Sequence, residues 1–286
     1  MYTSFSSRVR RTSTFLAALL LAPASLGVLT GEARAGSWPA EVTASYKITF
    51  NGFDLGTFRF QSRFDQDQYA LDGNADISAL LGAFTWQGIT RTSGRLDGDA
   101  PRPGSYSFAF RSSSKTGSVV MRYEKGGVRD VKAVPEVEPS AEIVPVKEHH
   151  LKGTLDPLSA VIALSRGAAG NPCDRRLPIF DGKQRFDLTL AFRRQQRIVE
   201  TRPSGQPDVG YVCSVRYQPI AGYKKSEETR RMSEATSIEV VLRPIPSAGL
   251  HVPHQITIPT IAGLAVLTAE RVEIKTRNSG EIALVN

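Results

Sequence analysis

Residues 44–64 read ASYKITFNGFDLGTFRFQSRF, and this stretch decides the class of fold. Apolar side chains alternate with polar ones on both sides of Asn51-Gly52. The alternating apolar residues are Tyr46, Ile48 and Phe50 before this pair and Phe58, Phe60 and Phe64 after it. A period of two places these side chains on one face of a strand, and Asn-Gly is favoured in tight hairpin turns. The stretch therefore predicts a half-buried β-hairpin.

The same alternation recurs along most of the chain. It returns at residues 106–110, 186–192, 211–217, 238–242 and 272–274, with glycine- or proline-containing turns at 96–99, 125–127, 181–182, 203–205 and 246–249. Strand-like runs separated by turns are typical of antiparallel sheets. The sequence predicts a mainly all-β fold, with a large curved antiparallel sheet or open barrel of about a dozen strands.

One segment has a different pattern and predicts a single short helix over residues 158–166. Asp156 suits the N-cap, Pro157 suits the first helical position, and Gly167 suits the C-terminal stop. Leu158, Ile162 and their neighbours make the helix largely apolar, so we expect it to cover the hydrophobic face of the curved sheet. The proline- and glutamate-rich residues 134–152 form an irregular crossing that leads to it.

The first 35 residues have the pattern of a cleaved secretory signal peptide. Basic Arg8, Arg10 and Arg11 precede an uncharged, mostly apolar stretch at 15–29, and Ala33-Arg-Ala35 supplies the small-x-small cleavage pattern. The stretch is too short for a membrane span of about 20 residues. We predict Sec export to the periplasm with cleavage after Ala35, and no transmembrane segment in the mature chain.

Residues 36–286 are predicted to be one antiparallel β domain, since all-β folds of about 200 to 250 residues are often single domains. The full chain has net charge +8, and four basic residues and one acidic residue lie in the signal peptide, which leaves +5. The basic pairs at 175–176, 193–194, 224–225 and 230–231 are interpreted either as solvated strand edges and loops or as peripheral contacts with anionic envelope components. No nucleic-acid partner is expected for an exported protein.

Cys173 and Cys213 are the only cysteines. Two thiols in an oxidising compartment are most simply one disulfide, and neither a Cys-x-x-Cys pattern nor a histidine neighbour indicates redox catalysis. Cys173 lies in a predicted loop and Cys213 in an alternating strand. We therefore predict a structural disulfide that joins a loop to a strand.

No catalytic, metal or cofactor site is predicted. The four histidines form His149-His150 and His251-x-x-His254, but no cysteine or carboxylate cluster completes a metal site, so solvated loop positions are the simpler interpretation. Asp181 belongs to an Asp-Gly turn and Asp187 is expected on the polar face of the next strand, which argues against a carboxylate pair for acid/base chemistry. Hydrolase and phosphate-binding motifs are absent from the sequence.

Residues 80–89, LLGAFTWQGI, are apolar at both phases of the strand alternation. They fit either a central strand buried on both faces or the lining of an apolar ligand site inside a curved sheet. The second interpretation predicts a cavity between the concave face of the sheet and the helix. Its predicted lining residues are Phe58, Phe60, Phe84, Trp86, Leu158 and Ile162.

Three segments resemble a known family. They are the strand pair at 44–56, the helix start LDPLSAVI at 155–162, and LPIFDGKQRFDL at 177–188. Together they are similar to the exported proteobacterial family of domain of unknown function 3108, over most of residues 42–270. The resemblance implies a periplasmic protein with a large antiparallel sheet, and it carries over no activity and no site residues.

Three function hypotheses remain open on the sequence. The first is a non-catalytic periplasmic protein that holds an apolar or amphiphilic envelope molecule in its curved sheet, as periplasmic lipoprotein carriers do in a similar architecture. The second is a scaffolding envelope protein with a packed core. The third is a hydrolase of envelope polymers, which would require a convergent catalytic set.

Overall fold

The computed structural model of the chain describes residues 38–79, 82–136, 138–166, 171–277 and 280–286. The predicted signal peptide at 1–35, its cleavage site after Ala35, Leu80, Leu81 and the predicted helix stop at Gly167 lie outside the described residues.

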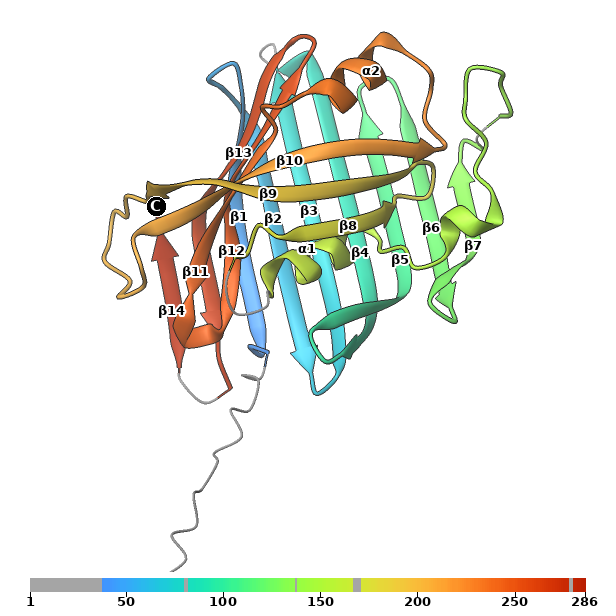
Figure 1. The fold of residues 1–286 in the computed structure, drawn as a ribbon. Helices are drawn as coiled ribbons and strands as arrows, with labels where there is room; N and C mark the ends of the chain where they lie inside the picture. The colour runs from blue at the N-terminus through green and yellow to red at the C-terminus, as the bar shows by residue number, and fades with distance from the viewer. Residues whose placement is uncertain (1–37, 80–81, 137, 167–170, 278–279) are drawn as a thin grey trace, which may run out of the picture. The chain divides into compact units, whose positions relative to one another are not determined.

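The structure confirms a mainly β fold built on one antiparallel sheet, shown in Figure 1. Fourteen strands are described, somewhat more than the predicted dozen. The strands are β1 Glu41–Phe50, β2 Phe53–Asp65, β3 Gln68–Ala79, β4 Phe84–Asp97, β5 Ala100–Ser112, β6 Thr116–Glu124, β7 Gly127–Val134, β8 Arg175–Phe180, β9 Arg185–Arg197, β10 Val209–Ala221, β11 Glu239–Ile245, β12 Leu250–Thr260, β13 Gly263–Lys275 and β14 Glu281–Val285. Their order in the sheet is β7-β6-β5-β4-β3-β2-β1-β13-β12-β11-β10-β9-β8, and β14 pairs with β13.

The predicted hairpin of residues 44–64 is confirmed as β1 and β2. Tyr46 pairs with Phe58, and the alternating burial along β1 follows the period of two. Asn51 and Gly52 make the turn with φ angles of 50° and 85°, a left-handed conformation that asparagine and glycine tolerate best. Local sequence thus fixes the register of this pair.

The sheet is not closed, because the two ends of its path, β7 and β8, are not paired with each other within the described residues. A short segment, residues 153–155, lies between β7 and β8 and contacts both ends of the sheet. Gly153 N donates to Gly126 O (2.8 Å) beside β7, whereas Leu155 N donates to Pro178 O (2.8 Å) and Phe180 N donates to Leu155 O (2.9 Å) on β8. The curved sheet is therefore fastened into a barrel-like shape by residues 153–155.

The predicted helix is present as α1, Pro157–Ser165, directly after this segment. Asp156 is its N-cap and accepts from the backbone N–H groups of Leu158 and Ser159, and Pro157 takes the first helical position, as predicted. The helix packs against β4 and β5 on one side of the curved sheet and against β8 and β12 on the other side. It therefore lies inside the curved sheet (Figure 1).

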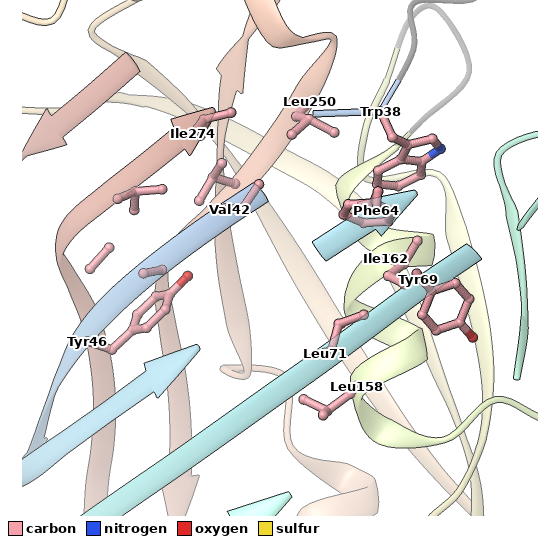
Figure 2. Packing of buried hydrophobic residues seen from close by; sticks show 14 of the residues in the cluster. Trp38, Val42, Tyr46, Phe64, Tyr69, Leu71, Leu158, Ile162, Leu250 and Ile274 are labelled. Carbon is pink, nitrogen blue, oxygen red and sulfur yellow. The ribbon is translucent and has the colours of Figure 1, made fainter. Parts of the chain in front are cut away.

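The main hydrophobic core surrounds one face of α1, as Figure 2 shows. Leu158 and Ile162 contribute from the helix, while Phe64 and Leu71 contribute from β2 and β3. A second buried cluster lies between α1 and β8–β11, and it contains Cys173 and Cys213. These two cysteines form the predicted disulfide, with Cα atoms 5.3 Å apart, which joins the turn before β8 to β10.

Two short 3₁₀ helices and a second α-helix complete the described elements. The 3₁₀ helices are η2, Glu148–Leu151, and η3, Pro246–Ala248. The α-helix is α2, Glu227–Glu234, where the sequence analysis expected only one helix. Ser226 caps α2 by accepting from Thr229 N, and acidic Glu227 and Glu228 begin it. This capping pattern was a usable indication of a helix that the search for apolar periodicity missed.

Two burial predictions were wrong. The interpretation of residues 80–89 as a strand buried on both faces fails, because Phe84 and Ile89 at the start of β4 are 43% and 45% exposed. Asp187 was expected on a polar surface, yet it is fully buried in β9. Arg176 and Arg185 cover this carboxylate at 2.6 Å and 2.5 Å. Paired arginines explain how a strand can bury an aspartate that its alternation places on the outer face.

Candidate apolar binding site

A small cavity, here called the inner cavity, lies between α1 and strands β1, β2, β12 and β13. Its volume is about 100 Å³. The residues around it are almost all apolar and include Phe58, Phe60, Leu158, Ile162 and Leu267. Ligand pockets usually span about 300–1,000 Å³, whereas apolar voids near 150 Å³ stay dry or admit only very small molecules. The inner cavity is therefore a packing gap beneath the helix and too small to hold an acyl chain.

A buried polar network holds α1 in place above this cavity. Besides its two cap bonds, Asp156 accepts from the hydroxyls of Ser159 (2.5 Å) and Thr92 (3.0 Å) through its second oxygen. Tyr69 on β3 shares a hydrogen bond with Ser159 at 2.8 Å. Burial raises the pKa of Asp156, and the hydrogen bonds from Ser159 and Thr92 oppose that shift. The network joins α1 to β3 and β4 and rigidly positions the helix.

An aromatic stack lies beside the inner cavity at the C-terminal end of α1. Trp38 and Phe64 stack with ring centroids 4.6 Å apart, and the guanidinium of Arg166 lies 4.5 Å from the Trp38 ring centroid. Arg166 is the C-cap residue of α1, and it also pairs with Asp99 in the β4–β5 turn at 3.1 Å. Cation–π and ionic contacts thus tie the end of the helix to the rim of the sheet.

A much larger hollow, here called the α2 groove, lies on the other side of α1. Its volume is about 620 Å³, inside the usual range for ligand sites. The apolar lining comes from the helices and from β8 to β12, through Leu164, Leu177, Phe186, Leu188, Leu190, Val215, Met232, Ile238, Val240, Ile256 and Ile258. Ile256 also lines the inner cavity, so the two hollows adjoin.

The polar groups of the α2 groove lie close to α2. Lys224, Ser226, Glu228 and Thr229 line it from the α2 region, and Gln184 lines it from the residues before β9. The Lys224 ammonium pairs with Glu142 at 2.8 Å, which raises the pKa of Lys224. A mainly apolar trough with a few polar groups suits a molecule with a long apolar part and a polar end.

Aromatic rings extend the inner wall toward the same end of the sheet as α2. Trp86 on β4 stacks with Phe110 on β5, with ring centroids 6.2 Å apart. The Trp86 ring lies directly over Gly88, where any side chain would collide with it, and the Phe58 ring lies in the same way over Gly73. Glycine at these positions lets large rings lie flat against the strands. The rings therefore extend little into the hollow.

The predicted ligand-lining residues separate into two groups. Phe58, Phe60, Leu158 and Ile162 surround the inner cavity, whereas Phe84 and Trp86 line neither of the two hollows described here. The α2 groove could not be found from the alternation of single strands, because its walls come from several separate strands and from a helix without an apolar repeat. The alternation at 186–192 and 211–217 marked the inward faces, but it did not show that they face one space.

The candidate acid/base and metal residues are not brought together. Asp187 is held by Arg176 and Arg185, while Asp181 accepts from the backbone N–H groups of Lys183 and Gln184 in its turn. Burial raises the pKa of Asp181. No group of three or more histidine, cysteine, aspartate or glutamate side chains suited to a metal ion is found among the described residues.

The histidine pairs occupy two separate places. His149 and His150 lie in η2 with ring centroids 4.1 Å apart. His251 and His254 lie on β12 and are half-buried, so the prediction of solvated loop positions was wrong for this pair. Burial lowers the pKa of both.

An open antiparallel sheet that curls around one of its own helices defines a β-barrel-like protein. The chain belongs to the family described as "Protein of unknown function (DUF3108)", whose profile matches residues 45–268. It is also similar in structure to a "Beta-barrel-like Protein of Domain of Unknown Function DUF1849 from Brucella abortus", with a TM-score of 0.52 and 14% identity, over 83% of this chain and 98% of that one. At this identity the likeness shows the fold alone.

The family and the similar structure indicate no catalytic class. No curated protein matches the chain. Among the described residues, no helix has the length and apolar character needed to cross a membrane.

Proposed function

We propose that this protein is an exported, non-catalytic binding protein of the cell envelope that holds an acyl-like apolar chain in the α2 groove. The observation that carries the proposal is the groove itself, about 620 Å³ of mostly apolar space between two helices and one wall of the sheet. Contiguous apolar surface of this kind is costly to leave in water, so a ligand that covers it is stabilised by the same area.

Export to the periplasm is the second part of the proposal. It is supported by the basic, apolar and small-x-small pattern at 1–35 and by the Cys173–Cys213 disulfide, which suits an oxidising compartment. Residues 36–286 are then the mature protein and function as one antiparallel β domain. N-terminal sequencing of protein recovered from a periplasmic fraction should begin at Gly36; an uncleaved cytoplasmic chain would contradict this part.

The main alternative is a scaffolding protein with a packed interior, and the α1 end of the hollow favours it. There the inner cavity is only about 100 Å³, and Leu158 and Ile162 are 5% and 2% exposed. The two hollows therefore support different functions, so the experiment has to test the α2 groove separately.

Binding is tested with a fluorescent acyl-chain probe and with native mass spectrometry of protein purified from the envelope. We expect saturable probe binding, and copurified lipid that is released on extraction. Leu188→Trp fills the α2 groove from β9 and should weaken probe binding at least tenfold. Thr189→Trp is the matched control, because Thr189 is the next residue of the same strand and is exposed.

Two results would contradict the proposed binding in the α2 groove. A wild-type protein that carries no lipid and binds no probe would overturn the proposal and leave the scaffold function. Equal loss of binding in Leu188→Trp and Thr189→Trp would place the ligand outside the groove. Melting temperatures of both variants show whether the fold is kept.

A further inference from the structure

The turns at the α2 end of the sheet expose large apolar side chains. Antiparallel pairing places the β1–β2 turn, the β12–β13 turn and the start of β4 at the same end, as Figure 1 shows. Phe53 is 75% exposed, Ile261 is 61% exposed and Leu264 is 42% exposed. Phe84, which follows the β3–β4 turn, is 43% exposed. Exposed apolar side chains on a protein surface are normally scattered singly, whereas here several large ones lie at one end of the sheet.

The β1–β2 and β12–β13 turns are fastened to each other. Asn51 Oδ1 accepts from Leu264 N (2.8 Å), Asn51 Nδ2 donates to Ala262 O (3.4 Å), and Asn51 N donates to Leu264 O (2.9 Å). Phe53, Ile261 and Leu264 are therefore held together in one preformed unit, here called the apolar tip. Preorganisation lowers the entropy lost when such a unit binds.

The backbone of the apolar tip is internally hydrogen-bonded. Thr260 Oγ1 accepts from Ala262 N (3.2 Å) and Gly263 N (3.1 Å) and donates to Gly263 O (2.9 Å). With the bonds to Asn51, the N–H and C=O groups of residues 262–264 all have partners within the protein. A loop can enter an apolar medium at low cost only when its backbone groups are satisfied in this way.

Charge at this end favours an anionic surface. Asp54 beside the tip is neutralised by Lys47 at 2.9 Å. Lys115 in the β5–β6 turn and Lys225, the residue before the N-cap of α2, make no ion pair in the described part of the chain, and the same holds for acidic Glu228. Basic side chains next to an apolar insertion are the usual combination in proteins that bind anionic membranes.

The opposite end of the sheet has polar turns. Gln66-Asp67 joins β2 to β3, and Gly98-Asp99 joins β4 to β5. Val199, 77% exposed in the connection between β9 and β10, is an exposed apolar residue away from the apolar tip. The turns at the α2 end of the sheet therefore carry apolar side chains, whereas the turns at the opposite end are polar.

We propose that the apolar tip enters the headgroup region of an anionic phospholipid bilayer, with Lys115 and Lys225 attracted to the lipid phosphates. A membrane fits better than a protein partner because the apolar residues are on projecting turns instead of on a flat face, and because the backbone groups of residues 262–264 have partners within the protein. The inference goes beyond ligand binding and does not depend on it. It also places the α2 end, and with it the α2 groove, near the surface from which an acyl chain would come.

The test is flotation of the mature protein with vesicles of phosphatidylethanolamine and phosphatidylglycerol. We expect the wild-type protein to float with the vesicles, and the double variant Phe53→Ser with Ile261→Ser to bind at least tenfold more weakly. Val199→Ser is the matched control, with an exposed apolar residue away from the apolar tip, and it should bind like the wild type. Lys115→Glu and Lys225→Glu should each weaken binding about fivefold.

Three results would overturn the proposal. They are a wild-type protein that stays with the soluble fraction, a double variant that floats as well as the wild type, and equal loss in Val199→Ser. A wild-type dimer that the double variant converts to monomer, without vesicle binding, would assign the tip to self-association. Leu188→Trp, which blocks only the groove, should float normally, so the vesicle test and the ligand test can fail independently.

Discussion

The two α-helices differ in how the curved sheet uses them. α1 is largely apolar and buries Leu158 and Ile162, and its N-cap Asp156 is fully buried. α2 has no buried residue, and five of its eight residues are charged, with Arg230 bridging Glu227 and Glu234. α1 is therefore part of the core, whereas α2 is a cover that is stabilised mainly by its own side-chain pairs. Stability and ligand binding should therefore respond to different helices.

The largest effect is expected from removing the apolar face of α1. Leu158→Ser and Ile162→Ser should each lower the free energy of unfolding by roughly 2–5 kcal/mol, since each leaves a cavity in the main core. Urea denaturation measures the loss, whereas the affinity of the folded protein for the acyl-chain probe should change little, because neither residue lines the α2 groove. Two variants as stable as the wild type would show that α1 is not a core element.

The disulfide comes next. The chain-entropy estimate for the 40-residue separation of Cys173 and Cys213 is about 4 kcal/mol before native-state strain. The double Cys173→Ser, Cys213→Ser variant should melt at a lower temperature, and alkylation of the native wild-type protein should detect no free thiol. Two thiols reactive without reductant would contradict the disulfide, and an unchanged melting temperature would contradict its stabilising role.

Met232→Ser in α2 is expected to separate binding from stability. Met232 is half-buried and lines the α2 groove, so its replacement should lower the free energy of unfolding by about 1 kcal/mol or less. Affinity for an acyl-chain probe should fall severalfold. Ser233→Ala is the control for helix damage, because Ser233 is half-buried on the same helix but lies outside the groove lining. Loss of stability as large as in Leu158→Ser would remove the distinction between the helices.

The smallest expected effect is a difference in the pH dependence of stability between Asp156 at α1 and Glu227 in α2. Burial raises the pKa of Asp156 above its ordinary 3.8, so its contribution to stability is greatest at low pH and is lost as the pH rises through the raised value. Hydrogen bonds from Arg230 and Arg231 lower the pKa of Glu227 from 4.5 to about 2, so its contribution is present above pH 4.5 and is lost as the pH falls.

Carboxyl-carbon NMR titrations of the two residues measure these shifts directly, with Asp156→Asn and Glu227→Gln to assign the signals. Titration of Asp156 below 3.8 or of Glu227 above 4.5 would reverse the expected contrast. Because Glu227 is exposed, raised salt should move its pKa back toward the ordinary value, whereas Asp156 should respond little.

Much of the fold was predictable because it depends on near neighbours along the chain. The alternation at Tyr46, Ile48 and Phe50, the turn at Asn51-Gly52 and the cap at Asp156 each reflect interactions within a few residues. The burial of Asp187 was not predictable, because Arg176 approaches it from the neighbouring strand. The exposure of Phe84 was not predictable either, since an apolar residue at the end of a strand does not reveal what lies opposite it.

An antiparallel sheet, one apolar helix and the pairing of the only two cysteines were predictable from the amino-acid sequence, because strand period, helix caps and cysteine number are local or countable properties. Three features depend on tertiary contacts: β7 and β8 stay apart, the larger hollow lies beside α2 instead of beneath α1, and the turns at Asn51 and Leu264 meet. These features arise from contacts between residues far apart in the chain; Asn51 and Leu264, for example, are 213 positions apart. No short-range pattern encodes such contacts.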